Sequence, residues 1–276
     1  DCDHYTSHCH DCPQLNSRKH RDMAYKIFDR KAQLLQGTNI RFVACSRWLG
    51  NMASNSRLLQ GKKVTCIPNA ININLFKPRN KQTCREALGL PQDKRLLLFS
   101  SHILSDERKG FHYLKEAVLR LTNDHPEWKD RLGLVLVGKD ITPTSYQDIP
   151  LEVYPLNYIA EEKQLVDIYN AVDLFVIPSL QDNLSNTIVE AMACGIPCIG
   201  FNVGGIPEMI DHLHNGYVAE YKNVGDFANG IHWLLTEGEY DILSREAARK
   251  AANTYGESSV ATKYISIYNQ MTGKNE

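Results

Sequence analysis

The chain has 276 residues, a formal net charge of -1, and 43% hydrophobic and 23% charged residues, which suits one large or two small globular domains. This near-neutral charge gives no broad field for nucleic acid, so we expect no nucleic-acid partner. No apolar run is long enough to span a bilayer and the first residues are polar, so we expect a cytoplasmic protein without a secretory leader.

The first fifteen residues are rich in cysteine and histidine and lack periodicity. They include five side chains that bind metals well: Cys2, His4, Cys9, His10 and Cys12. The C-x2-C spacing of Cys9 and Cys12 is typical of structural zinc sites, and one interpretation is a zinc ion on Cys2, Cys9 and Cys12. The other, reduced cysteines in a loop, stays equally open. Because the chain begins with Asp1 instead of Met, we expect a preceding segment, which can supply a further ligand.

Residues 17–35 carry apolar side chains at three- and four-residue spacing with basic residues between them, which predicts an amphipathic basic helix. We interpret the basic side as a solvated face, and the alternative is a peripheral contact with anionic lipid or a phosphate group. Short strands are predicted at 40–45 and 63–67, with Ser46 capping a helix between them. Residues 72–81 are polar and contain proline, which indicates a linker.

From Arg95 onward, short apolar runs alternate with helical patterns. Strands are predicted at residues 96–100, 134–137, 151–154, 174–177, 197–201 and 216–219. Helices are predicted at residues 111–121, 161–171, 185–194, 206–211, 224–235, 240–253 and 258–270. Such alternation is typical of buried parallel strands joined by crossover helices. We therefore predict an α/β fold with a doubly wound parallel sheet, in which ligands bind beyond the carboxyl ends of the strands.

The loop after the fourth of these strands is polar and leads into a helix near Ser185. Asp182 and Asn183 precede that helix, whose free backbone N–H groups can hold an anion or sugar hydroxyls. Glu190 follows two turns later, and a carboxylate there is suited to accept two hydrogen bonds from a ribose diol. The simpler interpretation is a capping Asp182 and a surface Glu190, but it leaves the apolar residues directly after Glu190 unexplained.

A charged turn at residues 105–110 follows the first strand. Arg108 and Lys109 can both bind phosphate, the arginine through paired hydrogen bonds and the lysine as a point charge. Gly110 permits close approach of the backbone. Charged turns are common on protein surfaces, and it is the position at a strand end that favours a phosphate-binding role.

Two glycines, Gly204 and Gly205, follow the fifth strand. They permit a tight turn against a ligand or a neighbouring helix. A plain strand-to-helix turn explains the same residues, and both interpretations stay open.

The loop and helix around Glu190 resemble the E-x7-E signature of GT-B glycosyltransferases of family 4, here Asp182-x7-Glu190 followed by E-A-M-A-x-G-x-P. Other segments resemble further motifs of this family in the expected order: Pro68-Asn69 with Phe76, Arg85 with Leu88-Gly89-Leu90, Lys109-Gly110, the strand ending at Gly138, and Gly204-Gly205 with Glu208. The resemblance covers residues 42–217. Each motif is weak alone, and their order makes the signal strong.

The resemblance implies three side chains that act in catalysis: Lys109, Arg108 and Asp182. It implies six residues that bind the donor: Glu190, Asn183, Leu184, Ser185, Gly138 and Gly204. Glu190 would bind the ribose, Asp182 the sugar hydroxyls, and Lys109 the leaving diphosphate. The residues at 183–185 would offer backbone N–H groups, and Arg108 would stand in for an arginine that the family carries elsewhere.

The implied protein is a retaining enzyme that moves a hexose from a UDP-sugar or GDP-sugar to a saccharide or lipid-linked acceptor. Surface polysaccharide biosynthesis at the inner face of the membrane is the implied setting, and no metal or other cofactor is required for catalysis. Two alternatives are a sugar-nucleotide epimerase of the same fold and a non-catalytic fragment that binds a sugar nucleotide.

The resemblance also implies a domain division. Residues 1–75 would be the end of an acceptor-binding domain with a linker, residues 76–256 the nearly complete donor-binding domain, and residues 257–276 a helix that packs back toward the first domain. Besides the displaced arginine and Ala70 in place of a glycine, the chain departs from the family pattern in two further ways. Asp182 replaces the commoner glutamate and is one methylene shorter, and most of the first domain is absent, so we expect this segment alone to be inactive.

Overall fold

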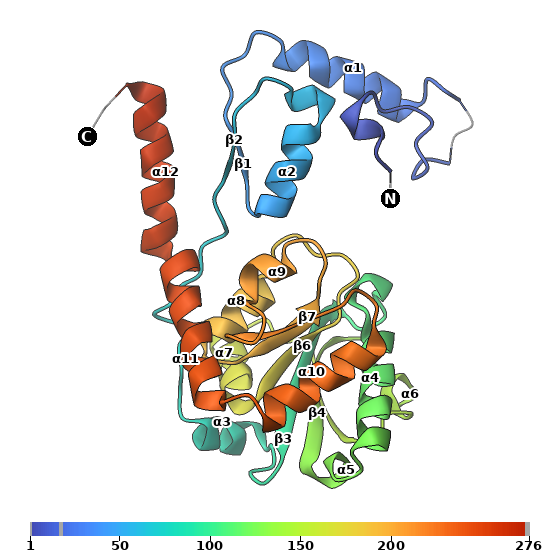
Figure 1. Cartoon of the computed structure of the whole chain (residues 1–276), viewed down its shortest axis with the longest axis vertical. Helices are drawn as coiled ribbons and strands as arrows, with labels where there is room; N and C mark the ends of the chain where they lie inside the picture. Colours follow the sequence, from blue (N-terminus) through green and yellow to red (C-terminus); the bar gives the residue numbers. More distant parts are fainter. Residues whose placement is uncertain (1, 17–18, 274–276) are drawn as a thin grey trace. The chain divides into compact units, whose positions relative to one another are not determined.

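The computed structural model describes residues 2–16 and 19–273 (Figure 1). By their internal contacts these residues form two compact units, Asp1–Pro68 and Asn69–Glu276. Asp1, residues 17–18 of the predicted basic helix and residues 274–276 of the predicted last segment lie outside the described residues. Within the described ranges, no helix is both long enough and apolar enough to cross a membrane.

The first unit contains a two-stranded parallel sheet in which β1 pairs with β2. Its elements are η1 (His4–Thr6), α1 (Met23–Leu35), β1 (Phe42–Ala44), α2 (Arg47–Asn55), η2 (Arg57–Leu59) and β2 (Val64–Cys66). The α1 helix begins at Met23 because the Asp22 side chain accepts a hydrogen bond from the Tyr25 N–H. Ser46 caps α2 in the same way, which confirms the predicted cap.

The second unit contains a six-stranded sheet in the order β5-β4-β3-β6-β7-β8, and every neighbouring pair is parallel. Its strands are β3 (Arg95–Ile103), β4 (Leu132–Lys139), β5 (Glu152–Leu156), β6 (Leu174–Ile177), β7 (Cys198–Phe201) and β8 (Gly216–Ala219). The predicted parallel α/β fold is therefore confirmed. From β3, the chain adds β4 and β5 on one side of the sheet and then β6, β7 and β8 on the other, so the switch point lies between β3 and β6. Ligands of such sheets bind beyond the carboxyl ends of the strands at this switch point.

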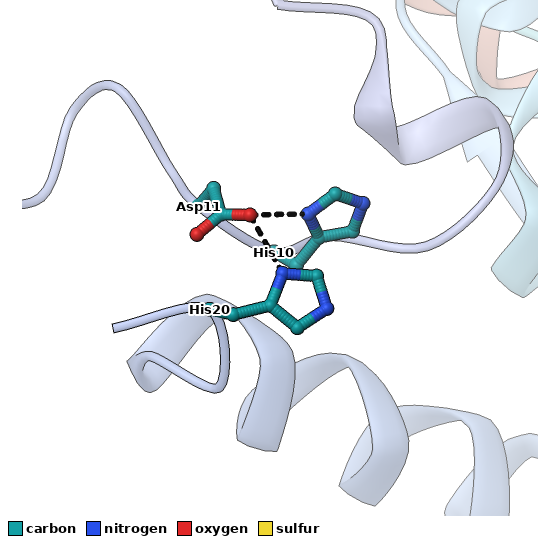
Figure 2. A group of neighbouring side chains, drawn as sticks. All are labelled: His10, Asp11 and His20. Carbon is teal, nitrogen blue, oxygen red and sulfur yellow. Dashed lines mark hydrogen bonds and ion pairs between the residues drawn. The ribbon is translucent and has the colours of Figure 1, made fainter. Parts of the chain in front are cut away.

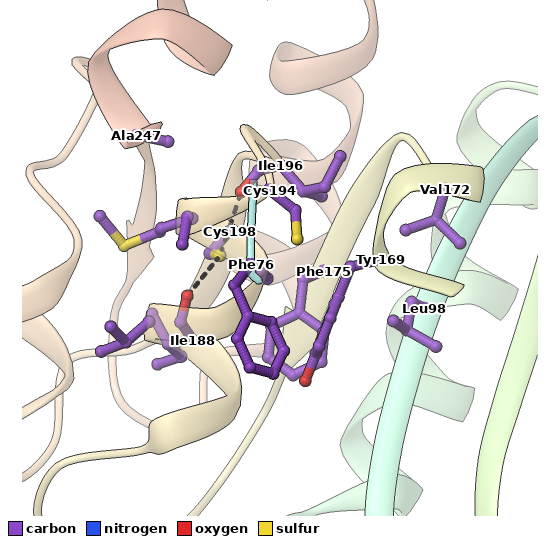
Figure 3. Packing of buried hydrophobic residues seen from close by; sticks show 14 of the residues in the cluster. Phe76, Leu98, Tyr169, Val172, Phe175, Ile188, Cys194, Ile196, Cys198 and Ala247 are labelled. Carbon is purple, nitrogen blue, oxygen red and sulfur yellow. Dashed lines mark hydrogen bonds between the residues drawn. The ribbon is translucent and has the colours of Figure 1, made fainter. Parts of the chain in front are cut away.

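Helices cover both faces of this sheet. The helical segments of the second unit are α3 (Lys81–Leu88), η3 (Glu107–Lys109), α4 (Phe111–Asp124), α5 (Trp128–Arg131), α6 (Pro143–Tyr146), α7 (Glu162–Ala171), α8 (Asn186–Ala193), α9 (Ile206–Met209), α10 (Val224–Thr236), α11 (Tyr240–Lys250), η4 (Ala251–Tyr255) and α12 (Glu257–Thr272). Alternate residues of β3 point to opposite faces, so Leu98 packs with α7 and α8 (Figure 3), while Leu97 and Phe99 pack with α4 and α10. Both faces of β3 are therefore apolar and each is covered by helices, which is the doubly wound arrangement.

The α3 helix was not predicted, although residues 72–80 before it lack regular structure as expected. Its apolar side is short: Cys84 is buried and Leu88 is half-buried against the core, which is less than the two turns that a periodicity argument needs. Its ends are set locally. The Asn80 side chain accepts a hydrogen bond from the Thr83 N–H, and Gly89 ends the helix at a φ of 65°.

The unit boundary at Pro68 places residues 69–75 with the sheet of the second unit. The Ile71 N–H donates to the Tyr255 carbonyl at 2.8 Å, which ties this segment to the π-helical turn η4. The acceptor and donor roles of the two units, and the packing of residues 257–276, stay predictions.

A group of charges around one buried carboxylate joins the amino ends of β3 and β6, and we call it the amino-edge cluster: Asp173, Lys81, Arg85 and Arg95. Asp173 is 1% exposed and its carboxylate oxygens lie 2.7 Å from Lys81 Nζ, 2.7 Å from Arg85 Nη2 and 3.2 Å from Arg95 Nη1. It also accepts a hydrogen bond from the Leu96 N–H at 2.7 Å. Burial by itself raises the pKa of Asp173, but the charge and hydrogen bond of Lys81, with the Leu96 N–H and Arg85, bring it below its ordinary value.

Candidate functional site

The loops after β3 and β6 are locked together at the switch point of the sheet. Gly110 has a φ of +70°, and a Cβ atom there would lie only 1.9 Å from the Pro178 carbonyl oxygen. The Leu180 N–H donates to the Arg108 carbonyl at 2.7 Å. A side chain at position 110 would therefore push the two loops apart. These contacts position the side chains that both loops carry.

The same two loops bring together a cation and an anion that are 73 residues apart in the sequence. Lys109 Nζ lies 2.9 Å from Asp182 Oδ2, and the two side chains are 32% and 12% exposed. Arg108 is instead 71% exposed and makes paired hydrogen bonds to Asp106, which lower the pKa of that carboxyl. Of the two predicted phosphate-binding cations, the structure pairs Lys109 with the predicted sugar-binding carboxylate and directs Arg108 to its own loop.

A third loop, after β7, presses on the backbone of Asp182. Gly204 has a φ of +59°, and a Cβ atom there would lie 1.8 Å from the Asp182 carbonyl oxygen. The Gly205 N–H donates to that oxygen at 3.1 Å. Gly138 has a similar role at the end of β4, where a Cβ atom would lie 2.2 Å from the Ser101 carbonyl. Backbone packing alone requires both predicted donor-binding glycines, and their contact with a donor stays a prediction.

The residues just before α8 form the predicted backbone cradle. Asn183 and Leu184 are half-buried, and Leu184 packs against the core beneath the loop. Ser185 is buried and begins α8, but its hydroxyl does not cap the helix and lies 2.8 Å from Thr187 Oγ1. Ser179, at the start of the same loop, is fully buried and its hydroxyl has no hydrogen-bond partner among the described residues. The loop thus retains hydrogen-bonding capacity that protein groups do not use.

Glu190 is half-buried on α8 and is held by a residue that sequence reasoning missed. The Tyr169 hydroxyl, on α7, donates to Glu190 Oε2 at 2.7 Å. Burial raises the pKa of Glu190, and the hydrogen bond from Tyr169 acts in the opposite direction. Burial and the neighbouring carboxylate raise the pKa of Tyr169 well above its ordinary value, so it remains a donor. Together, Lys109, Asp182, Glu190 and Tyr169 are called the carboxyl-edge cluster below.

The profile of the family described as glycosyl transferases group 1 matches residues 94–237, which is just over half of the chain. The chain belongs to this family. The matched range begins just before β3 and ends just after α10, so it contains the whole sheet and every residue of the carboxyl-edge cluster.

Named proteins of similar sequence or structure agree with this family assignment. The chain is 29% identical over 220 residues to the D-inositol 3-phosphate glycosyltransferase of Thermobispora bispora, covering 76% of this chain and 51% of that protein. It thus spans about half the length of this curated relative. Sucrose-phosphate synthase from Thermosynechococcus elongatus has the same fold, with a TM-score of 0.73 at 21% identity over 95% of this chain and 65% of that one.

A further solved structure with this fold is the Anabaena protein HepE in complex with UDP-glucose. Its TM-score is 0.66 at 20% identity, and the match covers 83% of this chain and 63% of that chain. The predicted GT-B type of fold and membership in a glycosyltransferase family are confirmed by these likenesses and by the family profile.

The predicted metal ligands of this group 1 glycosyltransferase lie in the first unit. Cys2 is exposed, and Cys9 and Cys12 are half-buried. Burial and then the neighbouring thiols of Cys2 and Cys12 raise the pKa of Cys9. Within residues 2–16 and 19–273, one group of three potential ligands has all its ligand atoms within 4.8 Å of one another, and it contains no cysteine: it consists of His10, Asp11 and His20. Zinc on Cys2, Cys9 and Cys12 therefore stays a prediction.

Proposed function

We propose that this chain binds a nucleotide-diphosphate sugar at the carboxyl edge of its six-stranded sheet, and that the whole protein is a retaining glycosyltransferase. One observation carries the proposal. Glu190 presents a half-buried carboxylate on α8 with one oxygen held by Tyr169, and the loop that leads into α8 carries Asp182, which pairs with Lys109 from the loop after β3. Burial raises the pKa of this carboxyl, which means that burying its charged form costs free energy. A purely structural role does not explain that cost.

In this proposal Glu190 binds the ribose of the donor. A carboxylate has four lone-pair sites, so the bond from Tyr169 leaves capacity for both hydroxyls of a ribose diol. Charge-assisted hydrogen bonds of this kind are each worth about 1.5–3 kcal/mol. Tyr169 fixes the orientation of the carboxylate and helps it to remain ionised.

Lys109 and Asp182 would act on the diphosphate and the sugar. An ammonium group has three donors, so Lys109 can keep its bond to Asp182 and still donate to a phosphate oxygen. The diphosphate gains negative charge as it leaves, and a fixed cation stabilises that state more than the ground state. Asp182 accepts hydrogen bonds from the sugar hydroxyls, and the leaving phosphate accepts the acceptor's proton on the same face of the sugar, which gives retention.

The identity of the donor and acceptor follows by likeness. The relative from Thermobispora bispora is a D-inositol 3-phosphate glycosyltransferase, and the Anabaena structure is a complex with UDP-glucose. We infer a UDP-sugar or GDP-sugar donor and a saccharide or lipid-linked acceptor. The basic α1 helix, which lies outside the matched family profile, is consistent with an acceptor that carries phosphate at the inner face of a membrane, as in surface polysaccharide biosynthesis.

Calorimetric titration of the purified chain with UDP-glucose, UDP-N-acetylglucosamine and GDP-mannose tests the donor site. We expect at least one of them to bind, and Glu190→Gln to weaken that donor about tenfold to a hundredfold because one or two charge-assisted bonds are lost. Glu116→Gln is the matched control, since Glu116 is exposed on α4 at the opposite face of the sheet. Failure of all three donors to bind, or equal affinity in Glu190→Gln, contradicts the proposal.

A further inference from the structure

Two histidine rings and one carboxylate converge in the first unit, far in sequence from the residues of the carboxyl-edge cluster. His10 Nδ1 lies 3.0 Å from Asp11 Oδ2, and His20 Nδ1 lies 2.6 Å from the same oxygen. Figure 2 shows both imidazole rings directed at this one carboxylate. The three ligand atoms all lie within 4.8 Å of one another. Three metal-binding groups are thus gathered at one place in the first unit.

The local backbone holds these groups in place. Asp11 adopts a φ of +43°, in the left-handed region that aspartate enters more readily than most residues other than glycine. His4 stacks on the His10 ring, with centroids 4.6 Å apart, and its Nδ1 bonds the His10 carbonyl at 2.8 Å. Directly after the site, the Cys12 N–H donates to the Asp22 side chain at 2.8 Å. Asp22 also caps α1, so the loop that carries His10 is fastened beside the segment that carries His20.

We propose that His10, Asp11 and His20 bind one divalent transition-metal ion of the zinc class. Imidazole nitrogen with a single carboxylate oxygen is a donor set that suits zinc, nickel and copper and does not suit magnesium or calcium. Zinc bonds to such atoms are about 2.0–2.1 Å long, which sets ligand atoms of a tetrahedral site about 3.3 Å apart. The present separations of 2.6 and 3.0 Å need to open by less than an ångström to admit the ion.

The site is open to solvent on one side. The side chains of His10, Asp11 and His20 are 32%, 50% and 64% exposed, so an ion can enter and water can complete its coordination. The ion would join the start of the chain to the turn before α1, which are nine to ten residues apart. This donor set differs from the predicted thiol set, because none of its atoms is a sulfur.

Calorimetric titration of the chelator-treated, dialysed chain with zinc chloride tests the proposal, with magnesium chloride as the comparison. We expect one equivalent of zinc to bind and magnesium to give no heat of binding. His20→Gln and Asp11→Asn each remove one ligand, and we expect each to weaken zinc binding by tenfold or more, since even changes in groups around a metal site cost about 10–100-fold. Circular dichroism verifies that these half-exposed substitutions leave the fold intact.

Two controls make the result specific. His214→Gln changes an exposed histidine of the second unit and leaves zinc binding unchanged. Cys9→Ser with Cys12→Ser removes the predicted thiol ligands, and we expect zinc affinity to be retained. Absence of zinc binding in the wild-type chain overturns the proposal, as does wild-type affinity in His20→Gln. Binding that is lost with the two cysteines and kept in His20→Gln also overturns it and assigns the metal to the thiols.

Discussion

The strands β3 and β6 carry ionic groups at both ends, and the two clusters differ in how completely protein atoms satisfy them. At the amino edge, the buried carboxylate of Asp173 faces three cations and one backbone N–H. At the carboxyl edge, Asp182 contacts one cation, and Glu190 contacts one hydroxyl. Where protein groups satisfy all the hydrogen bonds and ion pairs that a charged side chain can make, that side chain stabilises the fold. Where some of this capacity is unused, a ligand can bind to it.

The pKa values of the Asp173 and Glu190 carboxyls are shifted in opposite directions, so the two groups contribute to the free energy of unfolding with opposite signs. The folded-state pKa of Asp173 lies below its unfolded value of about 3.9, so its contribution to stability is complete above that pH and is lost as pH falls through the folded pKa. The folded-state pKa of Glu190 lies above its unfolded value of about 4.3, so ionisation of Glu190 destabilises the fold as pH rises through the folded pKa. Ionised Asp173 thus stabilises the fold, whereas ionised Glu190 destabilises it.

Asp173→Asn gives the largest expected effect, because it removes the charge that Lys81, Arg85 and Arg95 all face. Removing one partner of a buried ion pair costs about 3–5 kcal/mol, and we expect this loss in the free energy of unfolding measured with urea at neutral pH. The difference from the wild type should shrink below about pH 4, where Asp173 becomes protonated in the unfolded chain.

Asp167→Asn is the matched control for this substitution. Asp167 pairs with Arg79, and both side chains are about one third exposed. Such pairs contribute about 0–1 kcal/mol. If both substitutions cost the same, the amino-edge cluster contributes no more to stability than an ordinary half-exposed ion pair.

Tyr169→Phe gives an intermediate effect on donor binding and a change in its pH dependence. The hydroxyl contributes one hydrogen bond worth about 0.5–1.5 kcal/mol, so donor affinity at neutral pH should fall about two- to tenfold. The bond also lowers the pKa of Glu190, so its loss raises that pKa further. If donor binding needs ionised Glu190, affinity will decline at a higher pH in the variant as the solution is made more acidic. Calorimetry from pH 7 to pH 5 measures both effects.

Tyr217→Phe is the matched control, because the Tyr217 hydroxyl donates to Asp226 at 2.8 Å on the other side of the sheet. It removes the same type of bond and should leave donor affinity and its pH profile unchanged. An unshifted profile in Tyr169→Phe would show that this tyrosine contributes only packing.

Much of the fold could be predicted because buried parallel strands are continuous apolar runs. The bounds of β6 and β8 agree with the predicted ranges 174–177 and 216–219. The predicted position of α8 is correct within one residue at each end for a related reason, since a polar loop precedes an apolar helix. The α3 helix was not predicted because it is short and mostly polar, and one of its two buried residues is the charged Arg85.

The composition of the clusters was harder to predict, because it depends on contacts between distant residues. The loop positions predict Lys109 and Asp182 as separate site residues, but their ion pair spans 73 residues and depends on Gly110 fitting against Pro178. Tyr169 has the helical spacing of a core residue, and nothing in its neighbours reveals that its hydroxyl faces Glu190. In the first unit, the cysteine spacing predicts thiols as metal ligands, whereas the fold brings two histidines to Asp11.

Arg108→Gln gives the smallest expected effect and sharpens the comparison within the carboxyl edge. Arg108 and Lys109 are adjacent cations, but Arg108 is 71% exposed and pairs with Asp106, whereas Lys109 is half-buried against Asp182. An exposed charge contact is worth about 0.2–1 kcal/mol, so donor affinity should fall less than about fivefold in Arg108→Gln. Lys109→Gln removes a charge-assisted bond worth about 1.5–3 kcal/mol, so donor affinity should fall further in this variant than in Arg108→Gln. If Arg108→Gln is the more damaging substitution, Arg108 leaves Asp106 to bind the diphosphate, and the exposed cation has the role assigned here to Lys109.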